Sequence, residues 1–123
     1  MAARRNTMVQ RQLVDRGLTD QRVLDAMAEV PRERFVPRNL RRRAYDDGPL
    51  PIAEGQTISQ PFIVAAMTES AQVAASDRAL EIGTGSGYGA AVLSRVAADV
   101  VSVERHGLLA KSAADLLASL GYD

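Results

Sequence analysis

The chain has 123 residues, a length that predicts one structural domain. Its 46% apolar and 24% charged residues exclude a disordered chain, and fifteen basic side chains balance fifteen acidic ones, so nucleic acid is not an expected partner. The chain has no cysteine and a single histidine, His106, which argues against a disulfide framework and a metal site. No apolar run approaches the ~20 residues of a membrane span, and no hydrophobic stretch follows the basic start MAARR. We therefore expect a cytoplasmic monomer without a membrane partner.

The first part of the chain predicts two short helices ended by helix breakers. An i, i+4 spacing of apolar residues predicts an amphipathic helix over 7–16, which Gly17 ends. Thr19 or Asp20 can cap a second helix, which Pro31 stops. The buried face of that second helix is expected to be apolar: Val23, Leu24, Met27 and Val30.

The next stretch predicts an irregular segment that leads into a third helix. PRERFVP, at 31–37, is expected to be an extended connector because prolines stand at both of its ends. Residues 38–56 are rich in turn formers, with one short strand near 51–53. A helix is then expected from Ser59 or Gln60 to Ala75, with Ser59 able to cap it. Its inward positions are predicted to be apolar: Ile63, Val64, Met67 and Ala71.

The last part of the chain predicts strand, helix, strand and helix. The expected spans are a buried strand at 79–82, a helix at 87–96, an apolar strand at 100–103 and a helix at 108–120. This order is typical of the beginning of a doubly wound α/β sheet. Two segments of one structural domain follow: a helical and loop segment over 1–78, and the first half of a Rossmann-like cofactor-binding sheet over 79–123.

The strongest local signal is LEIGTGSG, in which three alternate glycines follow a strand and open a helix. Gly83, Gly85 and Gly87 allow a sharp backbone turn and the close approach of a ligand. The helix start offers unpaired N–H groups. Glu81 precedes the first glycine, and Glu104 closes the next strand at the position that often binds ribose hydroxyls.

Two cofactors fit this loop. A dinucleotide fingerprint can be placed on Gly85, Gly87 and Ala90. The carboxylate of Glu81 favours S-adenosylmethionine, because it attracts ammonium and sulfonium charges and repels a pyrophosphate. A tight strand-to-helix turn without any ligand is the third alternative.

Several stretches of the chain carry a resemblance to a known family. They are MVQRQLVDRGLTDQRVLDAM, VPRERFVP, AYDDGPLPI, GQTISQP and LEIGTGSGYGAAVLS, and they run in the family's order over roughly residues 7–122. With these motifs the sequence resembles the protein-L-isoaspartate O-methyltransferases. GQTISQP together with VPRERFVP is more specific to that family than the glycine loop.

The resemblance implies a Rossmann-like, S-adenosylmethionine-dependent methyltransferase fold with an N-terminal helical leader. It implies methyl transfer to the α-carboxylate of L-isoaspartyl and D-aspartyl residues, which repairs damaged proteins or peptides. It places the cofactor on Gly83, Thr84 and Gly85, with Glu104 on the ribose. The pattern of the loop itself adds two cofactor-binding residues: Glu81 and Gly87. It places the substrate on GQTISQP, with Ser59 as the family's active-site serine and these positioning residues: Thr57, Ile58 and Gln60.

Methyl transfer to a carboxylate requires positioning rather than a base. The nucleophile is already ionised at neutral pH, since a carboxyl group has a reference pKa near ~4. Ser59 and Thr57 can donate hydrogen bonds to one carboxylate oxygen and leave the other oxygen aimed at the methyl group. A covalent role for Ser59 would need a base, and His106 is expected to be an ordinary surface residue.

The sequence departs from the family's pattern at its end. It stops at LGYD, where a third strand is expected, so the sheet is predicted to be incomplete. A truncated, inactive or cofactor-binding remnant of the enzyme is therefore an alternative, and a dinucleotide-binding oxidoreductase is a weaker one. Smaller departures are Gly89, which weakens its helix, and the polar run that begins at Glu69.

Overall fold

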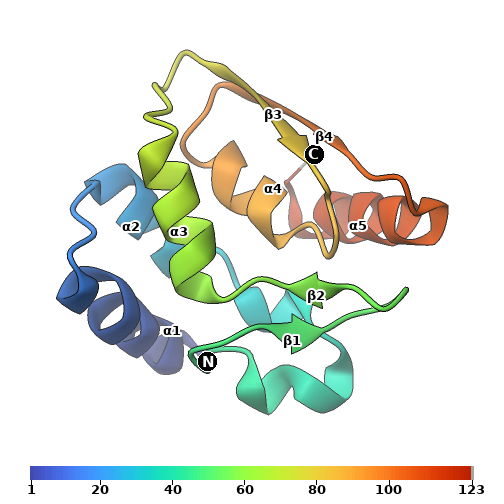
Figure 1. Ribbon diagram of the computed structural model, residues 1–123, viewed down its shortest axis with the longest axis horizontal. Coiled ribbons are helices and arrows are strands. Elements are labelled where there is room, and N and C mark those ends of the chain that lie inside the picture. Colours follow the sequence, from blue (N-terminus) through green and yellow to red (C-terminus); the bar gives the residue numbers. More distant parts are fainter. Residues whose placement is uncertain (123) are drawn as a thin grey trace.

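The computed structural model describes residues 1–122 (Figure 1). Its elements in chain order are α1 (Ala2–Met8), η1 (Val9–Leu13), η2 (Val14–Arg16), α2 (Gln21–Glu29), η3 (Arg32–Phe35), η4 (Arg38–Arg43), β1 (Leu50–Pro51), β2 (Thr57–Ile58), α3 (Pro61–Ser70), β3 (Arg78–Ile82), α4 (Tyr88–Ser94), β4 (Asp99–Val103) and α5 (Gly107–Leu120). Helices α1, α2 and α3 lie together, the β1–β2 hairpin lies beside them, and the β3–β4 pair lies over α4 and α5 (Figure 1).

The first helical stretch ends, and the second begins, where the sequence predicts, but the first stretch begins at Ala2 rather than at residue 7. α1, η1 and η2 follow one another without a break, through a π-helical turn and a 3₁₀ turn. Gly17 then adopts a φ of 98°, a left-handed conformation that suits glycine, and it stops the helix. Asp20 caps α2, because its side chain accepts a hydrogen bond at 3.0 Å from the backbone N–H of Arg22. The stop signal and the cap are both confirmed.

The segment between two prolines is helical, so the prediction of an extended connector at 31–37 is wrong. Element η3 is a 3₁₀ turn in which the Arg34 N–H donates to the Pro31 carbonyl at 2.9 Å. Two buried side chains hold this turn. Phe35 is 3% exposed, and the fully buried Arg32 donates hydrogen bonds to backbone carbonyls. Proline fixes φ on either side of the turn but does not by itself decide between turn and strand.

Helix α3 is shorter than predicted and lacks the predicted cap. It ends at Ser70 rather than Ala75, and the chain leaves the helix through Gln72, whose φ is 53°. Ser59 does not cap it, because Gln60 occupies the cap position and makes no side-chain cap hydrogen bond. Pro61 at the first helical position lacks an N–H, so one of the donors that are left without a partner at a helix start is absent here.

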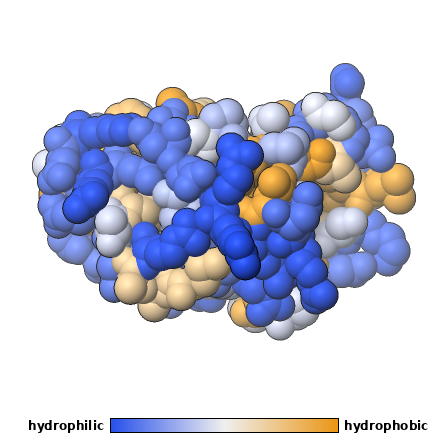
Figure 2. Space-filling model, turned by 90° about the horizontal axis from the view of Figure 1, so that it is seen from below, coloured by the Kyte–Doolittle hydropathy of each residue, from blue (hydrophilic) through white to orange (hydrophobic). Residues whose placement is uncertain are grey.

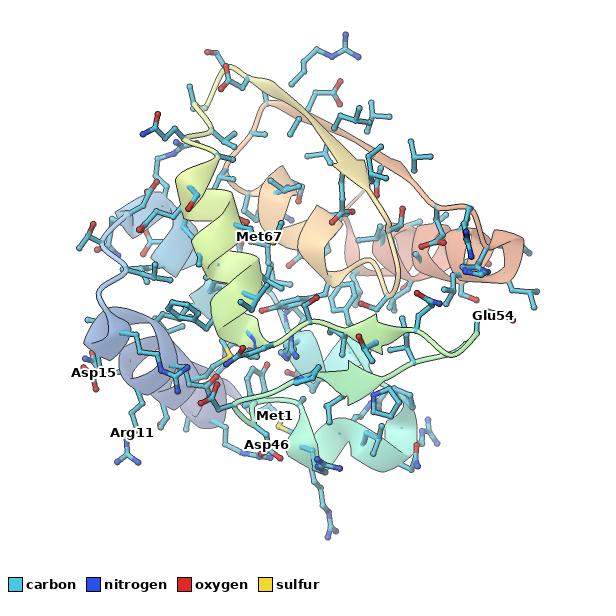
Figure 3. The ribbon with its side chains drawn as sticks, viewed as in Figure 1. Met1, Arg11, Asp15, Asp46, Glu54 and Met67 are labelled. Carbon is cyan, nitrogen blue, oxygen red and sulfur yellow. The ribbon has the colours of Figure 1, made fainter. Side chains whose placement is uncertain are left out.

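The faces of α3 also differ from the prediction. Ala65 and Thr68 are buried, whereas Ile63 and Met67, which were expected to point inward, are 41% and 69% exposed. Met67 (Figure 3) lines a hollow between α3 and β3 instead of the core. The run PFIVAAM is apolar on every side, so its periodicity does not specify which face is covered.

Strands β3 and β4 form the predicted parallel pair, but the expected burial of 79–82 is wrong. Helices α4 and α5 lie on the same side of this pair (Figure 1). Successive residues of a strand point to opposite faces, so only alternate side chains are covered. The other face, called here the open face, carries four exposed apolar side chains: Leu80, Ile82, Val101 and Val103.

One apolar core joins the two segments of the chain. Phe35 and Tyr88 pack edge to face, with ring centroids 5.7 Å apart and ring planes at 65°. Buried aliphatic residues from both segments belong to the same core: Met8, Leu13, Met27, Val30, Ala91 and Val92. The surface seen from below is mostly hydrophilic, with smaller apolar patches (Figure 2). Within residues 1–122, no helix is long and apolar enough to cross a membrane.

Candidate functional site

The glycine loop follows β3 and opens α4. Gly83, Gly85 and Gly87 all have positive φ values, of 91°, 55° and 94°, which explains why glycine is needed at each position. The N–H of Gly83 donates to the carbonyl of Val103 at 2.7 Å, so the loop is tied to the end of β4. A Cβ atom at Gly83 would meet no atom within 4 Å, which leaves the backbone open to a ligand.

Gly87 differs from the other two glycines because it faces the protein. A Cβ atom there would lie 3.3 Å from the Cβ of Ala113 and 3.4 Å from Leu117. This glycine therefore allows α4 and α5 to approach closely. The dinucleotide fingerprint needs a ligand at Gly87, and its environment does not favour that alternative.

Glu104 connects β4 to the glycine loop. One oxygen of its carboxylate accepts the N–H of Gly85 at 2.9 Å, and the other accepts the N–H of His106 at 2.9 Å. These two backbone hydrogen bonds lower the pKa of Glu104. An ionised carboxylate thus stands directly beside the loop, where it can accept further hydrogen bonds from hydroxyl groups.

Glu81 belongs to a chain of polar groups beneath the loop. The hydroxyl of Ser102 donates to its carboxylate at 2.5 Å, and the hydroxyls of Ser102 and Thr84 are 2.6 Å apart. Burial raises the pKa of Glu81, although the Ser102 hydrogen bond acts in the other direction. A Cβ atom at Gly89 would lie 2.5 Å from Glu81 Oε2, so this helical glycine leaves room for the carboxylate.

The GQTISQP segment lies next to this loop. Thr57 and Ile58 form β2, which pairs with β1 in antiparallel register, and β2 runs below the end of β3 and the start of α4 (Figure 1). Ile58 is buried, whereas Thr57 and Ser59 are exposed. The side chain of Gln60 donates to Asp47 at 2.6 Å, and Asp47 is also paired with Arg16.

A cavity of about 100 Å³ separates the two segments. Seven of the predicted site residues line it: Thr57, Ile58, Ser59, Glu81, Gly83, Thr84 and Gly85. A hollow of about 400 Å³ between α3 and β3 shares several of these residues, among them Ser59 and Glu81. Gln60 and Gly87 do not line the small cavity, and Glu104 reaches it only through its bond to Gly85.

Three residues of this site have no counterpart in the sequence prediction. Ser102 is the polar residue in an otherwise apolar part of β4, and that interruption was the only available signal. Tyr88 lines the cavity from the start of α4, although its side chain is almost wholly buried. Arg32 holds the Ser59 carbonyl at 2.9 Å from behind, a contact between residues too distant in sequence for any local pattern. In residues 1–122, no group of three or more His, Cys, Asp or Glu is placed to hold a metal ion.

Comparisons with known sequences agree on one family. The family model for protein-L-isoaspartate(D-aspartate) O-methyltransferase (PCMT) matches residues 3–123. A protein-L-isoaspartate O-methyltransferase from Pelotomaculum thermopropionicum is 56% identical over 122 residues, which are 99% of this chain and 53% of the relative. One from Roseiflexus castenholzii is 61% identical over 111 residues, which are 90% of this chain and 51% of the relative.

Solved structures share the fold. One protein-L-isoaspartate O-methyltransferase has a TM-score of 0.80 at 31% identity, and the match covers 100% of this chain and 40% of that enzyme's chain. A Plasmodium falciparum protein named as such an enzyme was solved in complex with S-adenosyl-L-homocysteine. It has a TM-score of 0.79 at 23% identity, and the match covers 94% of this chain and 55% of the Plasmodium chain.

The parallel strand pair and the glycine loop define a Rossmann-like α/β protein of the methyltransferase type. Within that class the chain belongs to the protein-L-isoaspartate(D-aspartate) O-methyltransferase family. The resemblance seen in GQTISQP and VPRERFVP is thereby confirmed. The chain spans about half the length of the curated relatives it matches.

Proposed function

We propose that the protein carrying this chain transfers a methyl group from S-adenosylmethionine to the α-carboxylate of L-isoaspartyl and D-aspartyl residues in damaged cytoplasmic proteins, and that it acts as a monomer. Family membership supports the reaction. The observation that supports a role for particular residues in this reaction is the small cavity between GQTISQP and the glycine loop. Substrate and methyl donor need adjacent sites, and this cavity has one segment on each side.

The residues of the loop fit S-adenosylmethionine. Its sulfonium centre supplies an activated methyl group. Glu104 would accept hydrogen bonds from the ribose hydroxyls, as an ionised carboxylate beside an open backbone can. Gly83 and Gly85 have no Cβ atom, so a ligand can approach the backbone of the loop on either side of Thr84. Glu81 adds a second negative charge beside the loop. Two carboxylates at one loop favour a cationic ligand over a pyrophosphate.

The residues of GQTISQP would position the substrate. A carboxylate is ionised at neutral pH, so the site needs hydrogen-bond donors rather than a base. Ser59 and Thr57 are exposed at the cavity and can donate to one substrate oxygen. Holding the attacking group in this way can supply as much as ~7–11 kcal/mol. Gln60 would act indirectly, since its bond to Asp47 fixes the start of α3.

The direct test is a methyl-ester assay with an isoaspartyl peptide and its normal aspartyl counterpart, using the complete polypeptide that carries residues 1–123. Methylation of the isoaspartyl peptide alone is expected. S-adenosylhomocysteine should bind, and NAD should not. Tighter binding of NAD, or equal methylation of both peptides, would contradict the proposal.

Ser59→Ala tests the role of the serine. Because Ser59 does not cap α3, the change should leave the free energy of unfolding within about 0.5 kcal/mol of wild type. The rate of methylation should fall by about 10- to 100-fold, with S-adenosylhomocysteine affinity unchanged. Ser70→Ala, on the exposed end of α3, is the matched control and should alter neither quantity. An equal loss of rate and cofactor affinity would contradict a substrate role.

The remnant alternative is supported by the open face of the β3–β4 pair, which leaves apolar side chains in solvent. We therefore expect residues 1–123, produced alone, to bind S-adenosylhomocysteine weakly and to form little methyl ester. Rapid methylation by this chain alone would exclude the remnant alternative.

A further inference from the structure

Arg32 is a buried cation that lies behind the candidate site. Its side chain is 0% exposed. Nε donates a hydrogen bond to the carbonyl of Ala44 at 2.6 Å, and Nη2 donates to the carbonyl of Ser59 at 2.9 Å. The guanidinium carbon lies 4.9 Å from the centroid of the Tyr88 ring. One side chain therefore connects three segments that are far apart in the sequence.

The burial of Arg32 is costly in free energy. No carboxylate forms a salt bridge with it among residues 1–122, and its Nη1 is buried without a protein hydrogen-bond partner. Burial lowers the pKa of the guanidinium, but arginine stays protonated in proteins. An apolar side chain of similar volume would avoid the cost of burying a charge. What such a side chain lacks is the rigid fork of donors that reaches two carbonyls at once.

The partners of Arg32 lie at the two sides of the small cavity. Ser59 lines it from the end of β2, and Tyr88 lines it from the start of α4, directly after the glycine loop. Arg32 itself does not line the cavity. We propose that Arg32 is a positioning residue, which fixes the Ser59 backbone against Tyr88 and so holds the Ser59 hydroxyl at a set distance from the glycine loop. This inference rests on the proposed function, in which Ser59 orients the substrate carboxylate.

Arg32→Lys tests the fork geometry while it keeps the charge. Lysine is a point charge on a flexible stem and cannot hold both carbonyls in the same plane. In the complete polypeptide we expect kcat for an isoaspartyl peptide to fall by about 10- to 100-fold. KM for the peptide and Kd for S-adenosylhomocysteine should change by less than about threefold, because the glycine loop and Glu104 are untouched.

Arg22→Lys is the matched control. Arg22 also donates to two backbone carbonyls, of Val73 at 2.7 Å and of Val96, but neither of these residues lines the small cavity. A loss of stability without a loss of kcat is expected from this variant. The comparison separates the general effect of a broken arginine bridge from an effect on Ser59.

A kcat of Arg32→Lys within about twofold of wild type, or an equal loss in Arg22→Lys, overturns the inference. Failure of the proposed function looks different, because the wild-type protein then forms no methyl ester. Hydrogen exchange decides in that case: Arg32→Lys should speed exchange of the amides of residues 57–60 more than Arg22→Lys does, and equal exchange overturns the positioning role. If Arg32→Lys does not fold, Arg32→Met is judged by the same readouts, because it removes the buried charge and fills much of the same volume.

Discussion

At the scale of single residues, the two carboxylates of the glycine loop have opposite electrostatic surroundings. Backbone hydrogen bonds from His106 and Gly85 lower the pKa of Glu104 and keep it ionised. Burial raises the pKa of Glu81, and the hydrogen bond from Ser102 offsets only part of that effect. The folded chain therefore stabilises the negative charge of Glu104, whereas the negative charge of Glu81 costs free energy of folding. A cost of this kind is common at functional sites, because a bound cation can remove it.

Glu81→Gln should therefore stabilise the chain at neutral pH. A carboxyl group whose pKa is raised on folding binds more protons in the folded state than in the unfolded state. Stability then falls as the pH rises from the unfolded pKa, near ~4, through the folded pKa, and it stays lower above that window. Glutamine keeps the acceptor for Ser102 and removes the charge. The free energy of unfolding in urea should rise at pH 7 and change little near pH ~3.

The same variant should bind S-adenosylmethionine about tenfold more weakly, since it loses the attraction to the positive ligand. Glu29→Gln is the control, because Glu29 forms an exposed ion pair with Arg95 and neither residue lines the small cavity. Its stability should differ from wild type by less than about 1 kcal/mol at either pH. If Glu81→Gln loses stability at neutral pH, the buried-charge argument is wrong.

The site residues that sequence reasoning finds are those with a local signal. Glycines in alternation, an acid before them and a hydroxyl-rich segment after a glycine can all be read along the chain, and the structure brings most of them to one cavity. Arg32 and Tyr88 act through contacts between distant segments, and Arg32 stands in a run of several charged residues. Ser59 was expected to cap α3, and it does not because Pro61 shifts the cap position to Gln60.

At the scale of elements, one side chain joins the end of α3 to the start of α2. Glu69 Oε1 accepts the N–H of Thr19 at 3.0 Å and the N–H of Asp20 at 2.7 Å. These donors lie at the N-terminus of α2, where backbone N–H groups lack helical partners and a negative charge is favourable. The polar end of α3 thus has a structural reason.

Glu69→Ala should destabilise the chain by about 1–3 kcal/mol, because two backbone N–H groups lose a charged acceptor. Glu69→Gln keeps an acceptor oxygen and should lose less. Urea unfolding followed by circular dichroism measures both. Asp115→Ala removes an exposed i, i+4 partner of Lys111 and should cost no more than about 0.5 kcal/mol. If Glu69→Ala and Asp115→Ala lower the free energy of unfolding equally, the contact of Glu69 with the start of α2 does not stabilise the chain.

Periodicity predicts which segments form elements better than it predicts their faces. The strand and helix order of the last part of the chain is confirmed, with a parallel register between β3 and β4. Helix α3 is apolar all round, so its covered face is decided by neighbours that local periodicity does not identify. The turn η3 depends on Arg32 reaching the Ala44 and Ser59 carbonyls, which is equally invisible to a local pattern.

At the scale of the whole molecule, the distribution of apolar surface is uneven. The core between α2, α4 and the N-terminal helices is closed, whereas the open face of the β3–β4 pair exposes Leu80 at 65% and Ile82 at 76%. Val101 and Val103 stand opposite these two residues in the neighbouring strand. A contiguous apolar surface of this kind favours binding to any apolar partner in solution.

Leu80→Lys should reduce that binding without weakening the fold. Residues 1–123 produced alone are expected to raise the fluorescence of a hydrophobic dye, and the variant should lower this signal severalfold. Because Leu80 is largely exposed, the free energy of unfolding should stay within about 0.5 kcal/mol. Leu108→Lys is the control: Leu108 is 70% exposed but lies at the start of α5, away from the open face, so the dye signal should persist. Equal loss in both variants would mean that the dye reports scattered apolar side chains, and a large destabilisation by Leu80→Lys would mean that this face is closed in solution.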